Sequence, residues 1–178
     1  CDEMGVLVWE ESLGWGNGAE TGKSPFPPDE SEDAGFCEMQ VRQTQEMVRA
    51  SFNHPSVIVY GFLNECASGR ESVKRLVDRL VATVKAEDSG RLVTFACNNI
   101  DVDVSCENVD LVSLNAYPGT IPATPGTPAQ LKEKVERRFT SAIARFRRRY
   151  PDKPIMVSES GCGGLYGMHD PNASINTE

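Results

Sequence analysis

The stretch Ser56-Val57-Ile58-Val59-Tyr60-Gly61-Phe62-Leu63-Asn64-Glu65 decides the fold, because it is a continuous apolar run that ends on a carboxylate. A second run, Pro154-Ile155-Met156-Val157-Ser158-Glu159, ends in the same way. Unbroken apolar runs of this length are typical of strands buried on both faces of a parallel sheet. The carboxyl ends of such strands hold the binding sites of α/β proteins. We therefore expect Glu65 and Glu159 at one rim of the sheet, facing a common cleft.

Two carboxylates across one cleft are the minimum apparatus for cutting a glycosidic bond. A retaining mechanism places them about 5 Å apart, with one protonated and the other ionised at rest. Glu65 follows an apolar strand, which favours the protonated form, whereas Glu159 lies between two serines, which favours the charged form. The alternative is that the two are surface acids that merely end strands.

Length and composition indicate a globular domain. The chain has 178 residues, of which 39% are hydrophobic and 25% charged, enough for one domain with a substantial core. The net charge of −8 argues against nucleic-acid binding, which needs a basic surface. No apolar run is long enough to span a membrane. The first residues show no signal peptide and no initiator Met, so we expect the chain to begin inside a longer one and assign no compartment.

The cysteines are scattered singly along the chain. They are Cys1, Cys37, Cys66, Cys97, Cys106 and Cys162. No CxxC pair and no Cys/His cluster with zinc-like spacing occurs, so we predict no metal site. We expect small buried thiols, with a disulfide pair as the alternative.

Strand and helix patterns alternate along the chain, which predicts an α/β fold with about five parallel strands. The expected strands are Gly5–Glu11, Ser56–Asn64, Arg91–Cys97, Val109–Asn115 and a fifth that ends at Glu159. The expected helices run from about Asp33 to Phe52, from a Ser68-x-x-Glu71 capping box to a stop at Ser89-Gly90, and from Pro128 through a basic last turn. Two architectures fit: a complete doubly wound sheet, or an incomplete (β/α)8 barrel, since a whole barrel needs about 250 residues.

Apolar positions recur at helical spacing in each expected helix. The positions of these stripes are Phe36, Met39, Gln40, Met47 and Val48, a loose stripe, in the first; Val73, Leu76, Val77, Leu80, Val81 and Val84 in the second; and Leu131, Val135, Phe139, Ile143 and Phe146 in the third.

The segment Asn53-His54-Pro55-Ser56-Val57-Ile58 through Asn64-Glu65 resembles glycoside hydrolase family 2, which holds β-galactosidases, β-glucuronidases and β-mannosidases. Three further stretches agree with that family in order and spacing. They are Cys1–Glu11, Asp88-Ser89-Gly90-Arg91-Leu92-Val93-Thr94, and Lys153-Pro154-Ile155-Met156-Val157-Ser158-Glu159-Ser160-Gly161. By this resemblance, residues 1–178 form a partial TIM-barrel catalytic domain that lacks strands one, two and eight.

The resemblance implies roles for several residues. Glu65 would be the general acid/base on strand four and Glu159 the nucleophile on strand seven. Asn64 would bind the sugar 2-hydroxyl, and Asn115-Ala116-Tyr117 resembles an N-x-Y segment whose Tyr donates to the nucleophile. The alternatives are a turn-forming Asn64 and a Tyr117 that is simply a buried amphipathic ring. The double-displacement chemistry requires no cofactor.

Further candidates lie in the loops near this rim. Glu11 could line the cleft or face solvent, and Trp15 could stack on a glycan or pack within its loop. His169, beside Asp170, could line the sugar site or belong to a plain loop pair. His54 is interpreted as a structural residue in the turn between helix and strand.

The resemblance predicts a retaining exo-β-glycosidase with a β-glycoside or oligosaccharide substrate, inactive as this fragment, and it leaves oligomeric state open. One alternative is an endo-acting barrel glycanase of the same clan, which an upstream sugar-binding sandwich domain would distinguish. Another is a non-catalytic carbohydrate-binding or interaction fragment, which would bind glycans without hydrolysing them. A doubly wound phosphate-binding domain is disfavoured, because no helix pattern follows Gly161-Cys162-Gly163-Gly164.

Overall fold

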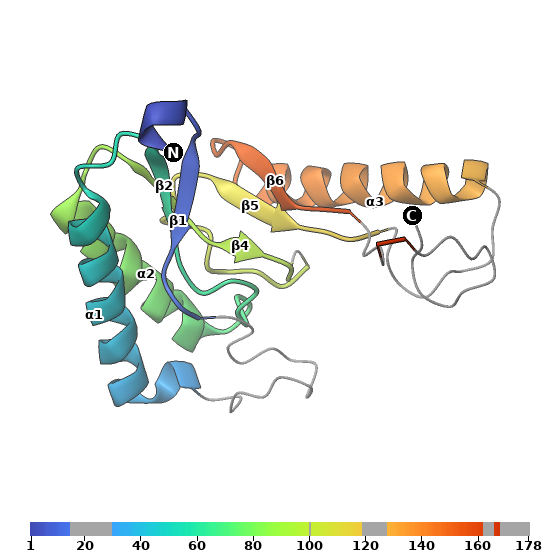
Figure 1. Ribbon diagram of the computed structural model, residues 1–178. Coiled ribbons are helices and arrows are strands. Elements are labelled where there is room, and N and C mark those ends of the chain that lie inside the picture. The colour runs from blue at the N-terminus through green and yellow to red at the C-terminus, as the bar shows by residue number, and fades with distance from the viewer. Residues whose placement is uncertain (15–29, 100, 119–127, 162–165, 168–178) are drawn as a thin grey trace.

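The computed structural model of the chain describes residues 1–14, 30–99, 101–118, 128–161 and 166–167 (Figure 1). Its strands are β1 Val8–Glu11, β2 Val57–Gly61, β3 Leu92–Thr94, β4 Ala96–Cys97, β5 Val112–Asn115 and β6 Ile155–Glu159. Its α-helices are α1 Ala34–Ser51, α2 Glu71–Glu87 and α3 Pro128–Arg149, with short 3-10 turns at Asp2–Met4 and Glu30–Glu32.

The strands form two parallel sheets in the orders β1-β2-β3 and β4-β5-β6. The expected strand Arg91–Cys97 is split at Phe95, because β3 pairs with β2 whereas β4 pairs with β5. Phe95 is fully buried and stacks on Phe62, with 6.4 Å between ring centroids. The predicted α/β fold with parallel strands is therefore confirmed. Within the described residues the sheets do not close into a barrel, since β1 and β6 each have one neighbouring strand.

Helices cover the sheets as the sequence predicts. In Figure 1, α1 and α2 lie side by side against the first sheet, and α3 runs along β6. All six apolar positions predicted for α2 are buried. Helix α1 begins at the N-cap Asp33, whose side chain accepts a hydrogen bond from the Phe36 N–H. Among the described residues, no helix combines the length and apolarity needed to cross a membrane.

Two local predictions for the helices are wrong. The buried positions of α1 are Cys37, Gln40, Thr44, Val48 and Ser51. Met39 is exposed instead, because the helix turns a small, partly polar stripe toward α2. The capping box before α2 does not form either: the N-cap is Arg70, without a side-chain cap. Ser68 is fully buried and lies 3.4 Å from the Cys97 sulfur, so it cannot reach the helix end.

The connection between β4 and β5 carries no helix in its described residues. Asp103, Ser105 and Cys106 are fully buried there, and Val109 nearly so. Tyr150, just after α3, donates a hydrogen bond of 2.6 Å to Asp103. This connection therefore occupies the place that a crossover helix takes elsewhere in the fold. Its packing includes the buried carboxylate of Asp103.

Candidate active site

The predicted site residues lie at or just after the carboxyl ends of parallel strands. Glu11 ends β1 and Asn64-Glu65 follow β2. Asn115 ends β5, and Glu159 ends β6. Because all of these strands run in the same direction, their ends meet at one rim, as the apolar runs predict.

The backbone after β2 is bent sharply to bring Glu65 to this rim. Leu63 and Glu65 have φ of 50° and 54°, in the left-handed region that residues with a Cβ rarely occupy. Such a conformation costs on the order of 1–3 kcal/mol and persists only where the surrounding structure enforces it. Here the Glu65 N–H donates to the Ala96 carbonyl at 2.8 Å, which anchors the bend to β4.

Asn115 connects the site residues through its side-chain amide. Its Nδ2 lies 3.1 Å from Asn64 Oδ1 and 3.1 Å from Glu65 Oε1, and it donates to both oxygens. Its Oδ1 accepts a hydrogen bond of 2.7 Å from Ser158 Oγ. Since Asn115 is only 3% exposed, this arrangement is enclosed, and it fixes which way the amide points.

The sequence predicts that Ser158 favours the charged form of Glu159, but it does not predict the hydrogen bond of Ser158 to Asn115, and a strand irregularity explains why. Neighbouring residues of a regular strand point to opposite faces, so Ser158 and Glu159 should not both reach the site. The register between β5 and β6 shifts, however, because Leu114 pairs with Val157 and Asn115 with Glu159. Ser158 is the extra residue of this β-bulge, and the bulge turns both side chains to the rim. No local sequence pattern marks a bulge at this position.

Tyr117 interacts with both glutamates. Its hydroxyl donates to Glu159 Oε2 at 2.5 Å, and the Ala116 N–H donates to the Glu159 carbonyl at 2.9 Å. This hydrogen bond, partial burial and the charges of both Glu159 and Glu65 raise the pKa of Tyr117 to about 12. Both carboxylates therefore lie close enough to affect the pKa of this one phenol.

Glu11 also lies near Glu159. Partial burial, and after it the negative charge of Glu159, raises the pKa of Glu11. Glu11 at the end of β1 and Glu159 at the end of β6 are thus close enough to interact. Trp15 and His169 lie outside the described residues. His54 lies in the turn before β2, where its Nδ1 is 2.7 Å from Asp2 Oδ2, so its expected structural role is confirmed.

Trp9 and Gly61 lie against each other next to Glu11. A Cβ added at Gly61 would lie 2.0 Å from the indole Nε1 of Trp9, far inside van der Waals contact. Glycine at this position allows the indole to lie directly on the β2 backbone at the carboxyl end of the first sheet.

The cysteines are free thiols in the described residues, and four of them are buried: Cys37, Cys66, Cys97 and Cys106. These four agree with the prediction of small buried thiols, whereas Cys1 is exposed and Cys162 lies outside the described residues. Burial raises the pKa of Cys66 well above its ordinary value. Cys97, Asp103 and Cys106 come together in one buried group, whose spacing in the sequence matches no familiar metal motif.

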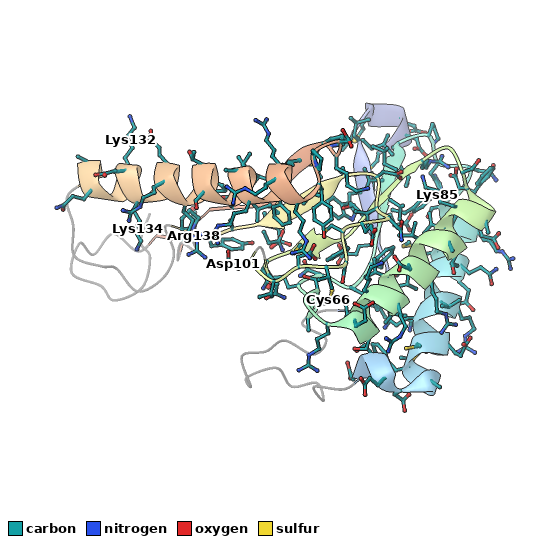
Figure 2. All side chains as sticks on the ribbon, turned by 180° about the vertical axis from the view of Figure 1, so that it is seen from behind. Cys66, Lys85, Asp101, Lys132, Lys134 and Arg138 are labelled. Carbon is teal, nitrogen blue, oxygen red and sulfur yellow. The ribbon has the colours of Figure 1, made fainter. Side chains whose placement is uncertain are left out.

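A basic hollow of about 570 Å³ lies between α3 and the segment after β4. Figure 2 shows Lys134 and Arg138 on the side of α3 that looks toward Asp101, whereas Lys132 points the other way. Arg145 pairs with Asp101 across this hollow. The rest of the basic run, in the last turn of α3, is exposed, as expected for cations at a helix C-terminus.

The chain is similar to known proteins over nearly its whole length. The sequence model of "Glycosyl hydrolases family 2, TIM barrel domain" matches residues 1–176. A β-glucuronidase of Chlorocebus aethiops is 28% identical over 179 residues, which cover 100% of this chain and 25% of that protein. The human β-glucuronidase shows the same identity and coverage. The chain thus spans about a quarter of the length of the curated relatives it matches.

A solved structure of a GH2 β-galacturonidase from Eisenbergiella tayi, bound to galacturonate, superposes with a TM-score of 0.78. It is 28% identical, and the match covers 96% of this chain and 28% of that one. The Ruminococcus gnavus β-glucuronidase superposes with a TM-score of 0.80 at 22% identity, covering 99% of this chain and 30% of that one, and shows the same fold.

Proposed function

We propose that this chain, which belongs to glycosyl hydrolases family 2, supplies the two catalytic carboxylates of a retaining exo-β-glycosidase. Glu159 is the nucleophile and Glu65 the general acid/base. The observation that carries the proposal is Tyr117, whose hydroxyl binds Glu159 and whose pKa responds to the charges of both glutamates. The influence of both charges on one phenol supports a placement of the two carboxylates at one site, which double displacement requires.

The surrounding groups suit the two roles. The hydrogen bond from Tyr117 stabilises a charged Glu159 and turns one of its oxygens away, which leaves the other free to attack the anomeric carbon. Asn115 holds Glu65 on one oxygen, so that the other can reach the glycosidic oxygen. Glu65 then gives its proton to the leaving group, and in the second step it takes a proton from water.

Asn64 is proposed to bind the 2-hydroxyl of the sugar. Its Oδ1 accepts from Asn115, which leaves its Nδ2 available to donate toward the cleft. Hydrogen bonds to this hydroxyl strengthen in an oxocarbenium-like transition state, so they contribute to rate as well as to binding.

The substrate class we propose is a β-linked uronic acid glycoside. The support comes from the matched proteins, which are named β-glucuronidase or β-galacturonidase. Initial rates on nitrophenyl β-glucuronide, β-galacturonide and β-galactoside, measured on the protein that contains this chain, test it. A preference for the neutral galactoside would contradict the uronide assignment.

Stereochemistry and mutation test the mechanism. Proton NMR of the first product should show the β-anomer, and an α-anomer would exclude retention. Glu159→Gln should lower kcat by roughly 10⁴-fold or more. Glu65→Gln should lower it by about 10²–10⁴-fold for poor leaving groups and much less for nitrophenol. Near-normal rates in both variants would remove the assignment, and cleavage only within long glycans would favour an endo-acting enzyme.

The 178 residues alone are proposed to be inactive. Within the described residues, β1 and β6 each leave one edge without a neighbouring strand. Unpaired edges of this kind promote association with other chains. Size-exclusion chromatography and a glycoside assay on the isolated chain test this, and a stable monomer with measurable turnover would contradict it.

A further inference from the structure

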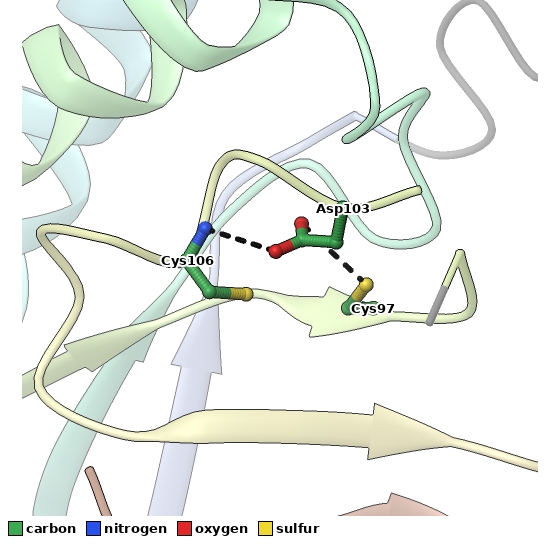
Figure 3. A group of neighbouring side chains, drawn as sticks. All are labelled: Cys97, Asp103 and Cys106. Carbon is green, nitrogen blue, oxygen red and sulfur yellow. Dashed lines mark hydrogen bonds between the residues drawn. The ribbon is translucent and has the colours of Figure 1, made fainter. Parts of the chain in front are cut away.

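The connection between β4 and β5 contains a buried group with the composition of a metal site. Cys97, Asp103 and Cys106 are each 0% exposed, and their ligand atoms all lie within 4.8 Å of one another. Figure 3 shows the sulfur atoms of both cysteines beside the Asp103 carboxylate. The three residues come from the end of β4 and from the loop that follows it, so the backbone itself places them together.

The distances suit a tetrahedral ion. With Zn–S of about 2.3 Å and Zn–O of about 2.1 Å, tetrahedral geometry places sulfur and oxygen ligands about 3.5 Å apart and two sulfurs about 3.8 Å apart. The Cys97 sulfur lies 3.9 Å from Asp103 Oδ1. Shortening the distance between this sulfur and this oxygen by a few tenths of an ångström would allow both to bind one ion. Rotation of the two side chains can supply a movement of this size.

The charge of the group also favours a cation. A fully buried carboxylate is normally paired with a positive side chain or with a metal, because desolvation of the charge is costly. Asp103 has four donors: the Ser105 and Cys106 N–H groups, the Tyr150 hydroxyl and the Cys97 thiol. Within the described part of the chain, no Lys, Arg or His forms an ion pair with it.

We propose that Cys97, Asp103 and Cys106 bind one Zn²⁺ ion as a structural site. Two thiolates and one carboxylate are a ligand set that Zn²⁺ prefers over Mg²⁺ or Ca²⁺, which take oxygen ligands. The fourth position falls to water or to Ser68, whose Oγ lies 3.4 Å from the Cys97 sulfur. The proposal is independent of the proposed glycosidase activity.

Binding balances in protons and charge. Each S–H bond breaks as a Zn–S bond forms, so two protons are released to solvent, and Asp103 exchanges the Cys97 thiol hydrogen bond for a Zn–O bond. The site then carries a net charge of −1. The two backbone N–H groups and the Tyr150 hydroxyl remain as donors that orient the carboxylate, as outer-shell groups do in zinc proteins.

The ion would hold the connection that replaces a crossover helix. Asn99 in this connection donates from Nδ2 to the Cys66 carbonyl at 2.7 Å, directly after the proposed acid/base Glu65. A zinc ion at Cys97 would therefore stabilise the backbone beside the site without touching substrate.

Metal analysis tests the proposal on the full protein, purified without chelators from zinc-supplemented cells. We expect Cys97→Ser and Cys106→Ser to lose about one equivalent of zinc per chain relative to the parent protein. Cys37→Ser is the matched control, because Cys37 is also buried but bonds to the Ser31 carbonyl, and it should lose none. Asp103→Asn should weaken zinc binding by more than the roughly 10–100-fold that loss of an outer-shell partner costs, because Asp103 is a direct ligand.

A second measurement keeps the test decisive if those variants do not fold. The parent protein refolded with Co²⁺ should show a thiolate-to-cobalt charge-transfer band that Zn²⁺ abolishes. Absence of this band, together with no zinc and freely alkylated Cys97 and Cys106 after denaturation, would overturn the proposal. A Cys97–Cys106 disulfide in the native protein, detected by mass spectrometry, would also overturn it.

Discussion

The hydroxyl oxygen of Tyr117 lies 2.5 Å from Oε2 of Glu159, and the phenol donates to the carboxylate. Tyr117 follows β5 and Glu159 ends β6, so two neighbouring parallel strands bring donor and acceptor together. The acceptor is the group that we propose as the nucleophile. The strength and direction of this hydrogen bond therefore bear on catalysis.

Removal of the hydroxyl should impair the chemical step. We expect Tyr117→Phe to lower kcat by about 10²-fold, the usual effect of losing one donor to a reacting oxygen. Thermal unfolding should change little, because Tyr117 is 40% exposed. Steady-state kinetics and a melting curve check both expectations, and an unchanged kcat would show that the phenol has no part in the reaction.

The same hydroxyl predicts a feature of the pH profile. Because the pKa of Tyr117 is raised to about 12, the phenol keeps its proton and its donor role throughout the neutral and mildly alkaline range. Ionisation above that pH would place a negative charge against Glu159. We therefore expect any alkaline loss of kcat below about pH 10 to persist in Tyr117→Phe. Its disappearance in the variant would assign that ionisation to Tyr117.

Ser158→Ala should misorient Asn115. The serine is the donor that fixes the amide, and one hydrogen bond is worth about 0.5–1.5 kcal/mol. We expect kcat to fall by about three- to tenfold with a small change in KM, and Ser158→Thr to restore most of the rate. Ser160→Ala is the matched control, since Ser160 is exposed on the far side of Glu159. Equal losses in the two alanine variants would exclude a positioning role for Ser158.

Gly61→Ala should destabilise the first sheet, because the new Cβ would lie 2.0 Å from the Trp9 indole. Overpacking of this kind costs about 1–3 kcal/mol in the free energy of unfolding. Gly90→Ala is the control, since its Cβ would meet the Asp88 carboxylate at an ordinary 3.5 Å. Chemical denaturation measures both variants. Adding Trp9→Leu to Gly61→Ala should recover part of the loss, because the two residues are in contact.

Asp2 should stabilise the N-terminal segment in a pH-dependent way. Hydrogen bonds from Ser56 and His54 hold the pKa of Asp2 well below its ordinary value. The folded state therefore favours the carboxylate. The contribution is full above the unfolded pKa of about 3.9 and is lost as pH falls toward the folded pKa. We expect the Tm difference between the parent protein and Asp2→Asn to be larger at pH 7 than at pH 3.

Glu3→Gln is the control for this prediction, since Glu3 is the exposed neighbouring acid. It should give a small and nearly pH-independent difference in Tm. A Tm difference for Asp2→Asn that grows as pH falls would contradict the assigned direction of the pKa shift.

Local sequence patterns determined most of the elements and the proposed catalytic pair. The apolar runs before Glu65 and Glu159 predict buried strands, and parallel strands place their ends together whatever the details of packing. The buried apolar positions of α2 could also be predicted, because helical periodicity depends only on spacing along the chain.

Tertiary packing alone decided the features that depend on contacts between distant residues. The β6 bulge brings Ser158 to Asn115, and the helix-free connection gathers Cys97, Asp103 and Cys106. Ser68 reads as a helix cap in the sequence, yet it lies buried against Cys97. The physical reason is the same in each case. A sequence pattern reports the periodicity of one element, whereas register shifts and loop paths are set by how several elements fill a common interior.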